Sequence, residues 1–509
     1  MPKEEAEPSA SGLAVAAKQN DVPTAENANH KESDAYASAS ASASSASTTP
    51  PPAHEDAEEA ELLERMRGDA VGNTMYSSRV ILKTVMRQLE DDLCKVWDMS
   101  VSPDVVTLLL ENGVIDPIMY TLVAGCEDLR LYEILIGLLG NMCAQVECAE
   151  LLASDRYTLE TLFKMTYCMD TAMLIQLMRL FQYIMAHVLS GKEKFAVNWY
   201  ICFAAFENSA QNLGRILQLS VSDELLVAAL KATNAVLASC ALVEEENANS
   251  TLNLKPFAKV FLVPELCDGV NSAFLRLMRD DQAKLTDDEA GEDNEDAEVP
   301  AAQDSDEDAD VGYDSCGPKI TCDVEIIQTY LNICTILVQL PEAQASMDVY
   351  APSIVSCLAR ILQFLQQPLQ LIPLGERQEE YLEDLAHIWS RLKYFYHKEA
   401  FLNLLELWYR LKQHIDNYTG GSDPDANEFE EDEEEEDDAP KEQYVENALK
   451  LLRLLACMVI KAENSDLQEI GDEKVQLFVS ALKAGKEEAI FSRALECLND
   501  KVAKESGQA

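Results

Sequence analysis

Side chains suited to catalysis are few in this chain, and their spacing forms no known catalytic set. It has six histidines among 509 residues, and those outside the N-terminal tail are His187, His387, His397 and His414. None lies at the spacing of a nucleophile–base pair or an H-E-x-x-H zinc motif, and no G-x-G-x-x-G or G-x-x-x-x-G-K-[S/T] phosphate loop occurs. We therefore predict no enzyme, no catalytic residues and no cofactor.

Two patterns resemble parts of metal sites. Cys143 and Cys148 are five residues apart, but no second pair and no histidine follows at zinc spacing. Residues 423–434 carry oxygen side chains at the first, third, fifth and twelfth positions of a calcium loop, but Glu428 replaces the required glycine. The cysteines are typical of a reduced intracellular core, and the second pattern of an acidic tract, so we predict no metal site.

Ser305 and Thr286 are candidate phosphorylation sites. Each is followed by three acidic residues, the context that an acidophilic kinase reads. A phosphate there would make a negative loop more negative rather than build a new site. The alternative is an unmodified, solvated loop.

Acidic residues gather in two tracts. Residues 280–314 contain 16 acids and one lysine, and residues 423–438 contain 12 acids and no base, which is 27 of the 50 net negative charges. Such density predicts disordered loops because like charges repel. A charge of this sign argues against binding nucleic acid or an anionic membrane and favours basic protein partners.

The helical elements are clearest in residues 89–143. Ser102-Pro103 is a helix start and Asn112-Gly113 a helix end; Asp116-Pro117 starts a second short helix. A third, longer helix follows, with an apolar stripe at spacings of three and four made of Leu131, Ile134, Leu135, Leu138 and Met142. Two short helices and a long one are the arrangement of an armadillo repeat.

This unit recurs along the chain. Residues 128–145 align with 170–187 at an offset of 42, and looser copies lie at 223–240, 323–340 and 451–458. The period and the three-helix unit predict an all-α armadillo/HEAT-like α-solenoid, interrupted by the two acidic inserts.

The predicted domain organisation follows composition and periodicity. It comprises a disordered Ala/Ser/Pro/Glu-rich tail (1–70), an N-terminal capping helix (71–101), armadillo-like repeats (102–279), an acidic insert (280–318), further armadillo-like helices (319–416), an acidic loop (417–441) and C-terminal helices (442–509). No secretory signal is recognisable, and the apolar runs look far too short to span a bilayer. The fourteen cysteines, scattered singly, suit a reducing compartment. We predict the nucleus, with the cytoplasm as the alternative.

Asn141 is the candidate protein contact. It lies near the end of the best third helix, where armadillo repeats of the importin type use an asparagine to hold an extended peptide. The tryptophan that usually precedes such an asparagine is missing, since Gly137 stands there. The alternative is that Asn141 caps its own helix end.

Trp97 and Asp98 are predicted to be structural, at the junction between the capping helix and the first repeat.

The strings GNTMYS (72–77), CKVWDMSVSPDV (94–105) and GLLGNM (137–142) resemble the serum amyloid A-like family, also called synoviocyte-proliferation-associated proteins. The resemblance covers about residues 72–145. It implies an armadillo-like fold, a nuclear or nucleocytoplasmic location and a role in promoting cell proliferation. It implies no catalytic or cofactor-binding residues.

Three functional hypotheses follow. The first is a non-enzymatic helical-repeat scaffold that binds other proteins and acts in growth control. The second is an acidic chaperone or escort for histones or other basic proteins, which would use the two acidic tracts. The third, a transport receptor, is disfavoured by the missing tryptophan array. The partner and the oligomeric state do not follow from the sequence.

Overall fold

A computed structural model describes most of the chain between residues 74 and 506. The described residues are 74–124, 128–189, 196–206, 208–246, 257–279, 320, 322–340, 343–367, 369–420, 439–462, 472–485 and 487–506. The chain divides into two units, Met1–Val80 and Ile81–Ala509, and the first described helix, α2 (Thr74–Met99), crosses that division. Both acidic tracts lie outside the described residues, as do Ser305, Thr286 and residues 423–434.

Every element in the described ranges is a helix, which confirms the predicted all-α class. After α2 the helices are α3 (Pro103–Glu111), α4 (Ile115–Ala124), α5 (Leu129–Met142), α6 (Val146–Ser154), α7 (Arg156–Met165), α8 (Thr171–Leu189), α9 (Ala196–Ala205), α10 (Ser209–Leu219), α11 (Asp223–Glu246), α12 (Phe257–Phe261), α13 (Pro264–Leu277), α15 (Val324–Gln339), α16 (Ala343–Leu365), α17 (Glu376–Arg391), α18 (Lys398–Gly420), α19 (Ala439–Lys461), α20 (Asp472–Ala484) and α21 (Ala489–Ser506).

The first repeat shows how local sequence sets these bounds. Pro103 occupies the first turn of α3, and Gly113 follows the helix with a φ of 65°, a conformation that glycine adopts without strain. Ser102 stands at the N-cap, but its hydroxyl makes no capping bond, contrary to expectation. The side chain of Asp128 does cap α5, because it accepts hydrogen bonds from the backbone N–H groups of Arg130 and Leu131.

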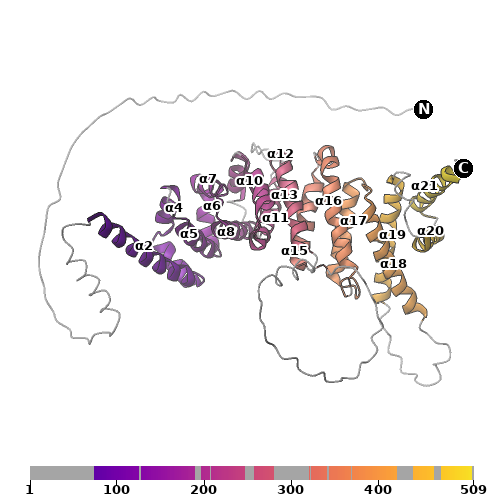
Figure 1. Ribbon diagram of the computed structural model, residues 1–509, viewed down its shortest axis with the longest axis horizontal. Helices are drawn as coiled ribbons and strands as arrows, with labels where there is room; N and C mark the ends of the chain where they lie inside the picture. Colours follow the sequence, from indigo (N-terminus) through magenta and orange to yellow (C-terminus); the bar gives the residue numbers. More distant parts are fainter. Residues whose placement is uncertain are drawn as a thin grey trace, which may run out of the picture. The chain divides into compact units, whose positions relative to one another are not determined.

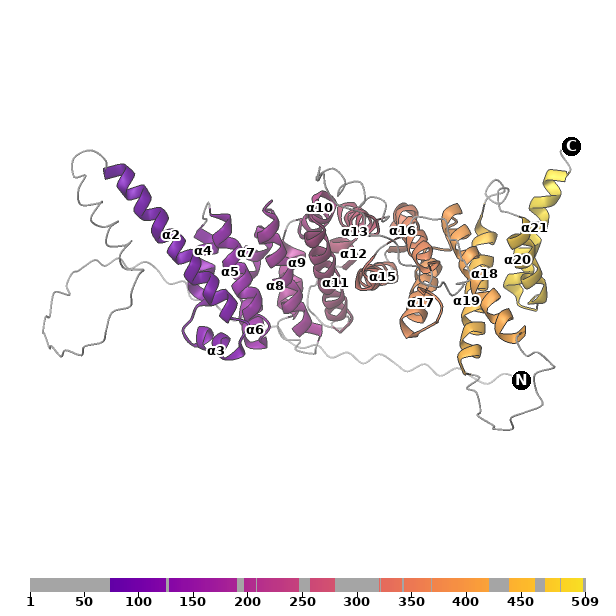
Figure 2. The same ribbon diagram turned by 60° about the horizontal axis from the view of Figure 1, so that its bottom comes forward.

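The helices of Ile81–Ala509 stack as a solenoid. The four aligned sequence copies fall on α5, α8, α11 and α15, and the last on α19. These long helices pack in order, α5 on α8, α8 on α11, α11 on α15, α15 on α17 and α17 on α19 (Figures 1 and 2). We call these six the ladder helices. A second row, α10, α13, α16 and α18, packs against the ladder helices from α11 to α19.

One continuous apolar core runs through the stack. Its bulkiest members include an aromatic cluster in the second and third repeats, where Phe163 lies edge-on to Phe181, Trp199 and Phe203 at centroid distances of 5.0–6.0 Å. Trp389 and Trp408 are likewise buried. Trp389 on α17 and Trp408 on α18 thus supply packing to two separate helices.

Two helices correct the expectation about apolar length. By length and composition alone, Asp223–Val243 in α11 and Asp348–Leu365 in α16 could each cross a membrane, and two bent pairs, α3 with α4 and α5 with α6, would pass the same test as single spans. Lys231 and Asn234 interrupt the apolar stretch of α11, so its uninterrupted apolar runs are shorter than the helix itself. In the fold, 61% of each of the two apolar windows is buried, and α11 packs between α8 and α15.

Candidate functional site: the polar face of the ladder helices

Asn141 lies on α5 with its side chain turned toward the end of α2. Its Nδ2 donates to the backbone carbonyl of Trp97 and to the hydroxyl of Ser100, both at 3.1 Å, and its Oδ1 accepts a long bond of 3.4 Å from Arg179 on α8. An asparagine amide holding a backbone carbonyl is the contact predicted for a bound peptide, but here the carbonyl belongs to the chain itself. Contact with a partner stays a prediction.

Trp97 fills the space above Gly137. A Cβ built on Gly137 would lie 2.3 Å from Cζ2 and 2.4 Å from Cε2 of the indole, so the ring rests directly on the glycine. Ser100 is fully buried and its hydroxyl donates to the Trp97 carbonyl at 2.6 Å, whereas Asp98 is exposed. Gly137 stands where importin-type repeats carry a tryptophan. A tryptophan 40 positions earlier occupies that space instead.

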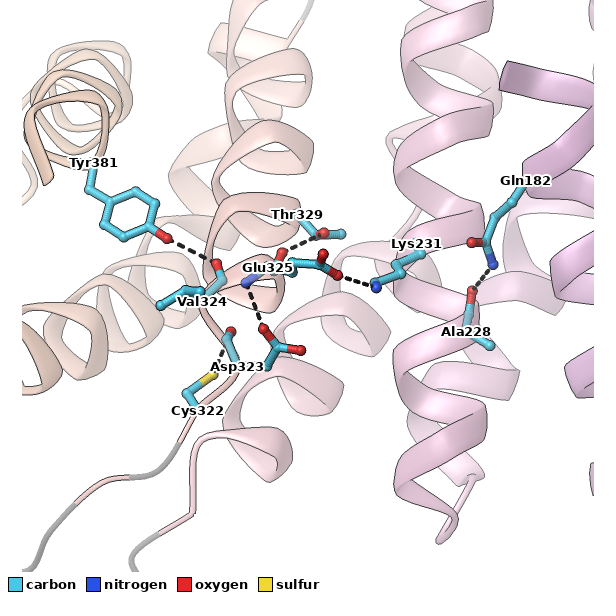
Figure 3. A network of polar contacts seen from close by, with 9 residues as sticks. All are labelled: Gln182, Ala228, Lys231, Cys322, Asp323, Val324, Glu325, Thr329 and Tyr381. Atoms are coloured by element: carbon cyan, nitrogen blue, oxygen red, sulfur yellow. Dashed lines mark hydrogen bonds and ion pairs between the residues drawn. The ribbon is translucent and has the colours of Figure 1, made fainter. Parts of the chain in front are cut away.

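Side chains cross from one ladder helix to the next in a series of polar rungs. Gln182 on α8 donates to the carbonyl of Ala228 on α11 at 3.2 Å, Lys231 on α11 pairs with Glu325 on α15, and the Tyr381 hydroxyl on α17 donates to the Val324 carbonyl at 2.9 Å (Figure 3). The series continues between α15 and α17 through Gln328–Asp384 at 3.3 Å. Between α17 and α19 it continues through Asn447–Glu379 at 2.6 Å and Lys450–Glu383 at 3.1 Å.

The charge of this face changes along the stack. Arg179 and Lys231 stand on α8 and α11, whereas α17 contributes Glu380, Glu383 and Asp384. Burial raises the pKa of Asp384, and Glu380 and Glu383 raise it further, while the hydrogen bond from Gln328 and the nearby His387 lower it only in part. A carboxylate that is incompletely compensated in this way favours a cationic neighbour. The α15–α17 part of the face therefore suits basic side chains.

Some polar groups between the ladder helices are under-paired. Among the described residues, buried atoms without a hydrogen-bond partner occur on four successive ladder helices, namely Asn234 Oδ1 on α11, Thr335 Oγ1 on α15, His387 Nε2 on α17 and Asn447 Oδ1 on α19. An unpaired buried polar atom costs free energy that water or a bound chain can recover. Unpaired buried atoms of the described residues also occur on Trp199, Gln367 and Trp389, so they are not confined to this face.

The side chains of Cys143 and Cys148 lie side by side in the core. Cys143 and Cys148 are fully buried with their sulfurs 3.7 Å apart, and burial raises the pKa of Cys143 well above its ordinary value, followed by the effect of Cys148. The ring of His187 meets the Cys143 carbonyl at 2.9 Å rather than a sulfur. Within the described residues, no three histidine, cysteine or acidic side chains converge to hold an ion.

Comparison with known proteins agrees with the family resemblance. No family model matches the chain. A Danio rerio protein is 34% identical over 124 residues, which is 20% of this chain and 25% of the relative. The relatives are proteins named saal1. The Xenopus tropicalis protein of that name is 26% identical over 201 residues (35% of this chain, 41% of the relative), and Homo sapiens SAAL1 is 31% identical over 138 residues (22% and 29%). The matches thus span between a quarter and two fifths of these relatives' own length.

Two solved structures of engineered proteins show a looser likeness. A designed armadillo repeat protein covers 59% of this chain and 94% of its own at a TM-score of 0.36 and 13% identity. A second engineered protein covers 59% and 90% at a TM-score of 0.35 and 12% identity. At these scores the likeness carries no argument, and the solenoid rests on the order and packing of the helices themselves.

Proposed function

We propose that this chain is a non-enzymatic helical-repeat scaffold that binds other proteins on the polar face of its ladder helices and acts in promoting cell proliferation. The observation that carries the proposal is the series of polar side chains that joins successive ladder helices, together with the under-paired buried atoms on α11, α15, α17 and α19. Polar groups repeated at each step of a solenoid can bind the regularly spaced backbone groups of an extended segment. The proliferative role rests on the resemblance to the saal1 proteins, and the nucleus is the proposed location, with the cytoplasm as the alternative.

Proximity labelling in cells tests the scaffold. The full chain is compared with a face variant, Asn234→Ala with Glu380→Lys, and with a control, Glu399→Lys, which makes the same charge change on α18 away from the ladder face. We expect the face variant to lose a defined set of labelled partners while the control keeps them, with equal thermal stability in all three. Identical partner sets in the three chains would refute the proposal. Microscopy of the same tagged chains tests the location.

The acidic tracts favour a second candidate, an escort for histones or other basic proteins. They hold 27 of the 50 net negative charges, so attraction for a basic protein would be strong at low salt and screened at high salt. Deleting residues 280–314 and 423–438 and measuring the binding of purified core histones separates the candidates. An escort loses salt-dependent binding on deletion. A scaffold keeps its face-dependent partners.

A further inference from the structure

A second surface lies outside the ladder rungs, on the second helices of the first two repeats. There α4 and α7, with the first turns of α5 and α8, enclose an open groove of about 260 Å³. Its lining is mainly apolar and consists of Leu122, Val123, Tyr132, Tyr157, Thr161, Lys164, Met165, Cys168 and Met173. The volume is below the roughly 300–1,000 Å³ of small-molecule sites, and it suits one or two side chains of a protein.

Apolar side chains continue onto the surface around this groove. Tyr157 on α7 is 57% exposed and Val123 on α4 is 40% exposed. Tyr120 on α4 and Met169, in the turn before α8, are exposed to 76% and 73%. A cluster of exposed tyrosine, valine and methionine side chains beside a groove marks an interaction surface in a chain that is otherwise so rich in charge.

One charge stands in this apolar setting. Lys164 is the sole charged side chain among the groove's lining residues, is exposed, and forms no ion pair with any residue in the described part of the chain. By contrast, Arg156 on the same helix is paired with Glu160 at 2.7 Å. Lys164 therefore has its positive charge available to a partner.

We propose that this groove binds a short segment of another protein that carries a bulky apolar side chain beside an aspartate or glutamate. The apolar side chain enters between α4 and α7 and contacts Leu122, Met165 and Met173, where the flexible methionines adapt to its shape. The carboxylate meets Lys164 at the rim. Tyr157 covers the anchor and excludes water from it, as aromatic residues do at the centre of protein interfaces.

The test uses short random peptides displayed on phage and selected on the full chain. Enriched peptides are then synthesised, and their affinities are measured by fluorescence polarisation against the wild type, Tyr157→Ser, Lys164→Glu and the control Lys461→Glu. Lys461 is an exposed lysine near the end of α19. Circular dichroism and thermal melting test whether all four proteins fold alike. We expect that they do, because Tyr157 and Lys164 are exposed and their replacement leaves the core unchanged.

The proposal expects a consensus with one large apolar residue and a nearby acid. Binding should weaken about tenfold in Tyr157→Ser and in Lys164→Glu but not in Lys461→Glu, and exchanging the peptide's acid for lysine should restore binding to Lys164→Glu. Three results would overturn the proposal: no peptide is enriched, the consensus lacks an acidic residue, or the peptides bind both groove variants as tightly as the wild type. A concentration-dependent dimer abolished by the same variants would assign the groove to a second copy instead.

Discussion

Gly137 and Gly140 lie one turn apart on α5 and differ in the space that each leaves for a side chain. A Cβ on Gly137 would overlap the Trp97 indole, whereas the nearest atom to a Cβ on Gly140 is 4.0 Å away. We expect Gly137→Ala to lower the free energy of unfolding by about 1–3 kcal/mol, because a rigid ring must be displaced.

Urea unfolding followed by tryptophan fluorescence measures this change, with Gly140→Ala as the matched control. That control should be neutral or stabilising by up to about 1 kcal/mol, since alanine is the better helix former. Equal effects of the two substitutions would contradict the contact between α2 and α5.

The raised pKa of Asp384 predicts an unusual pH dependence. Burial makes the folded carboxyl bind its proton more tightly than the unfolded one does, so ionising this group costs stability as the pH rises through the folded pKa. Asp384→Asn should therefore stabilise the protein at pH 7, and the gain should vanish near about pH 3, where the carboxyl is protonated in both states. Denaturant titrations at several pH values give the difference, and a loss of stability at pH 7 would contradict it.

For Glu406 on α18 we expect the opposite pH dependence of stability from that of Asp384. Burial raises the pKa of its carboxyl, but hydrogen bonds from Lys474 and Arg410 outweigh that effect and lower the pKa below its ordinary value. Its contribution to stability is present above the unfolded pKa of about 4.3 and is lost as the pH falls through the folded value. In the same titrations Glu406→Gln should destabilise the protein at pH 7 and make little difference in acid. A stabilising effect at pH 7 would show that burial outweighs the two bonds.

Some features of the candidate site can be recognised in the sequence, and others only in the structure. Asn141 and Trp97 stand out in the sequence because of their types and positions. Their contact does not, because it joins residues 44 positions apart through the angle at which α2 meets α5. The same limit applies to Asn447 and Lys450: nothing in a single sequence pairs them with Glu379 and Glu383.

Helices α10 and α13 cross at a pair of glycines. A Cβ on Gly214 would lie 2.1 Å from the carbonyl oxygen of Glu265, and one on Gly269 would lie 2.4 Å from the oxygen of Gly214. Backbone atoms cannot rotate away as a side chain can, so we expect Gly214→Ala to cost at least about 3 kcal/mol. Thermal and urea unfolding measure the loss, and a stability equal to that of the wild type would exclude this close crossing.

Elements were predictable where their signals are local. The apolar patterns of residues 128–145 and 323–340 predict the long helices α5 and α15 from neighbouring residues alone, and in the structure Asp128 and Asp323 cap these helices. The end of α18 was harder to place, since that helix continues to Gly420, beyond the predicted start of the acidic loop at 417. Short helices such as α12 (Phe257–Phe261) depend on burial of their aromatic residues by the stack, which a propensity argument does not contain.

At the scale of the whole chain, a net charge of −50 should make stability depend on salt. Self-repulsion opposes the compact state, and the Debye length falls from about 20 Å at 20 mM to about 4 Å at 500 mM. We expect the melting temperature to rise with sodium chloride over that range.

Deletion of residues 280–314, which carry 16 acids and one lysine, should reduce the slope of melting temperature against salt. A melting temperature that falls with salt would instead mean that ion pairs such as Arg453–Glu488, at 2.9 Å, outweigh the repulsion.

The crossing of α10 and α13 also limits which substitutions this chain can accept during evolution. Each glycine leaves room for the other helix's backbone, so replacing either one alone harms the fold whatever the second residue is. A distant relative should therefore retain both glycines or separate the two helices altogether. Some relatives have diverged too far for their repeats to be aligned by sequence. In these, a pair of glycines that corresponds to Gly214 and Gly269 would show how the third repeat aligns with the fourth.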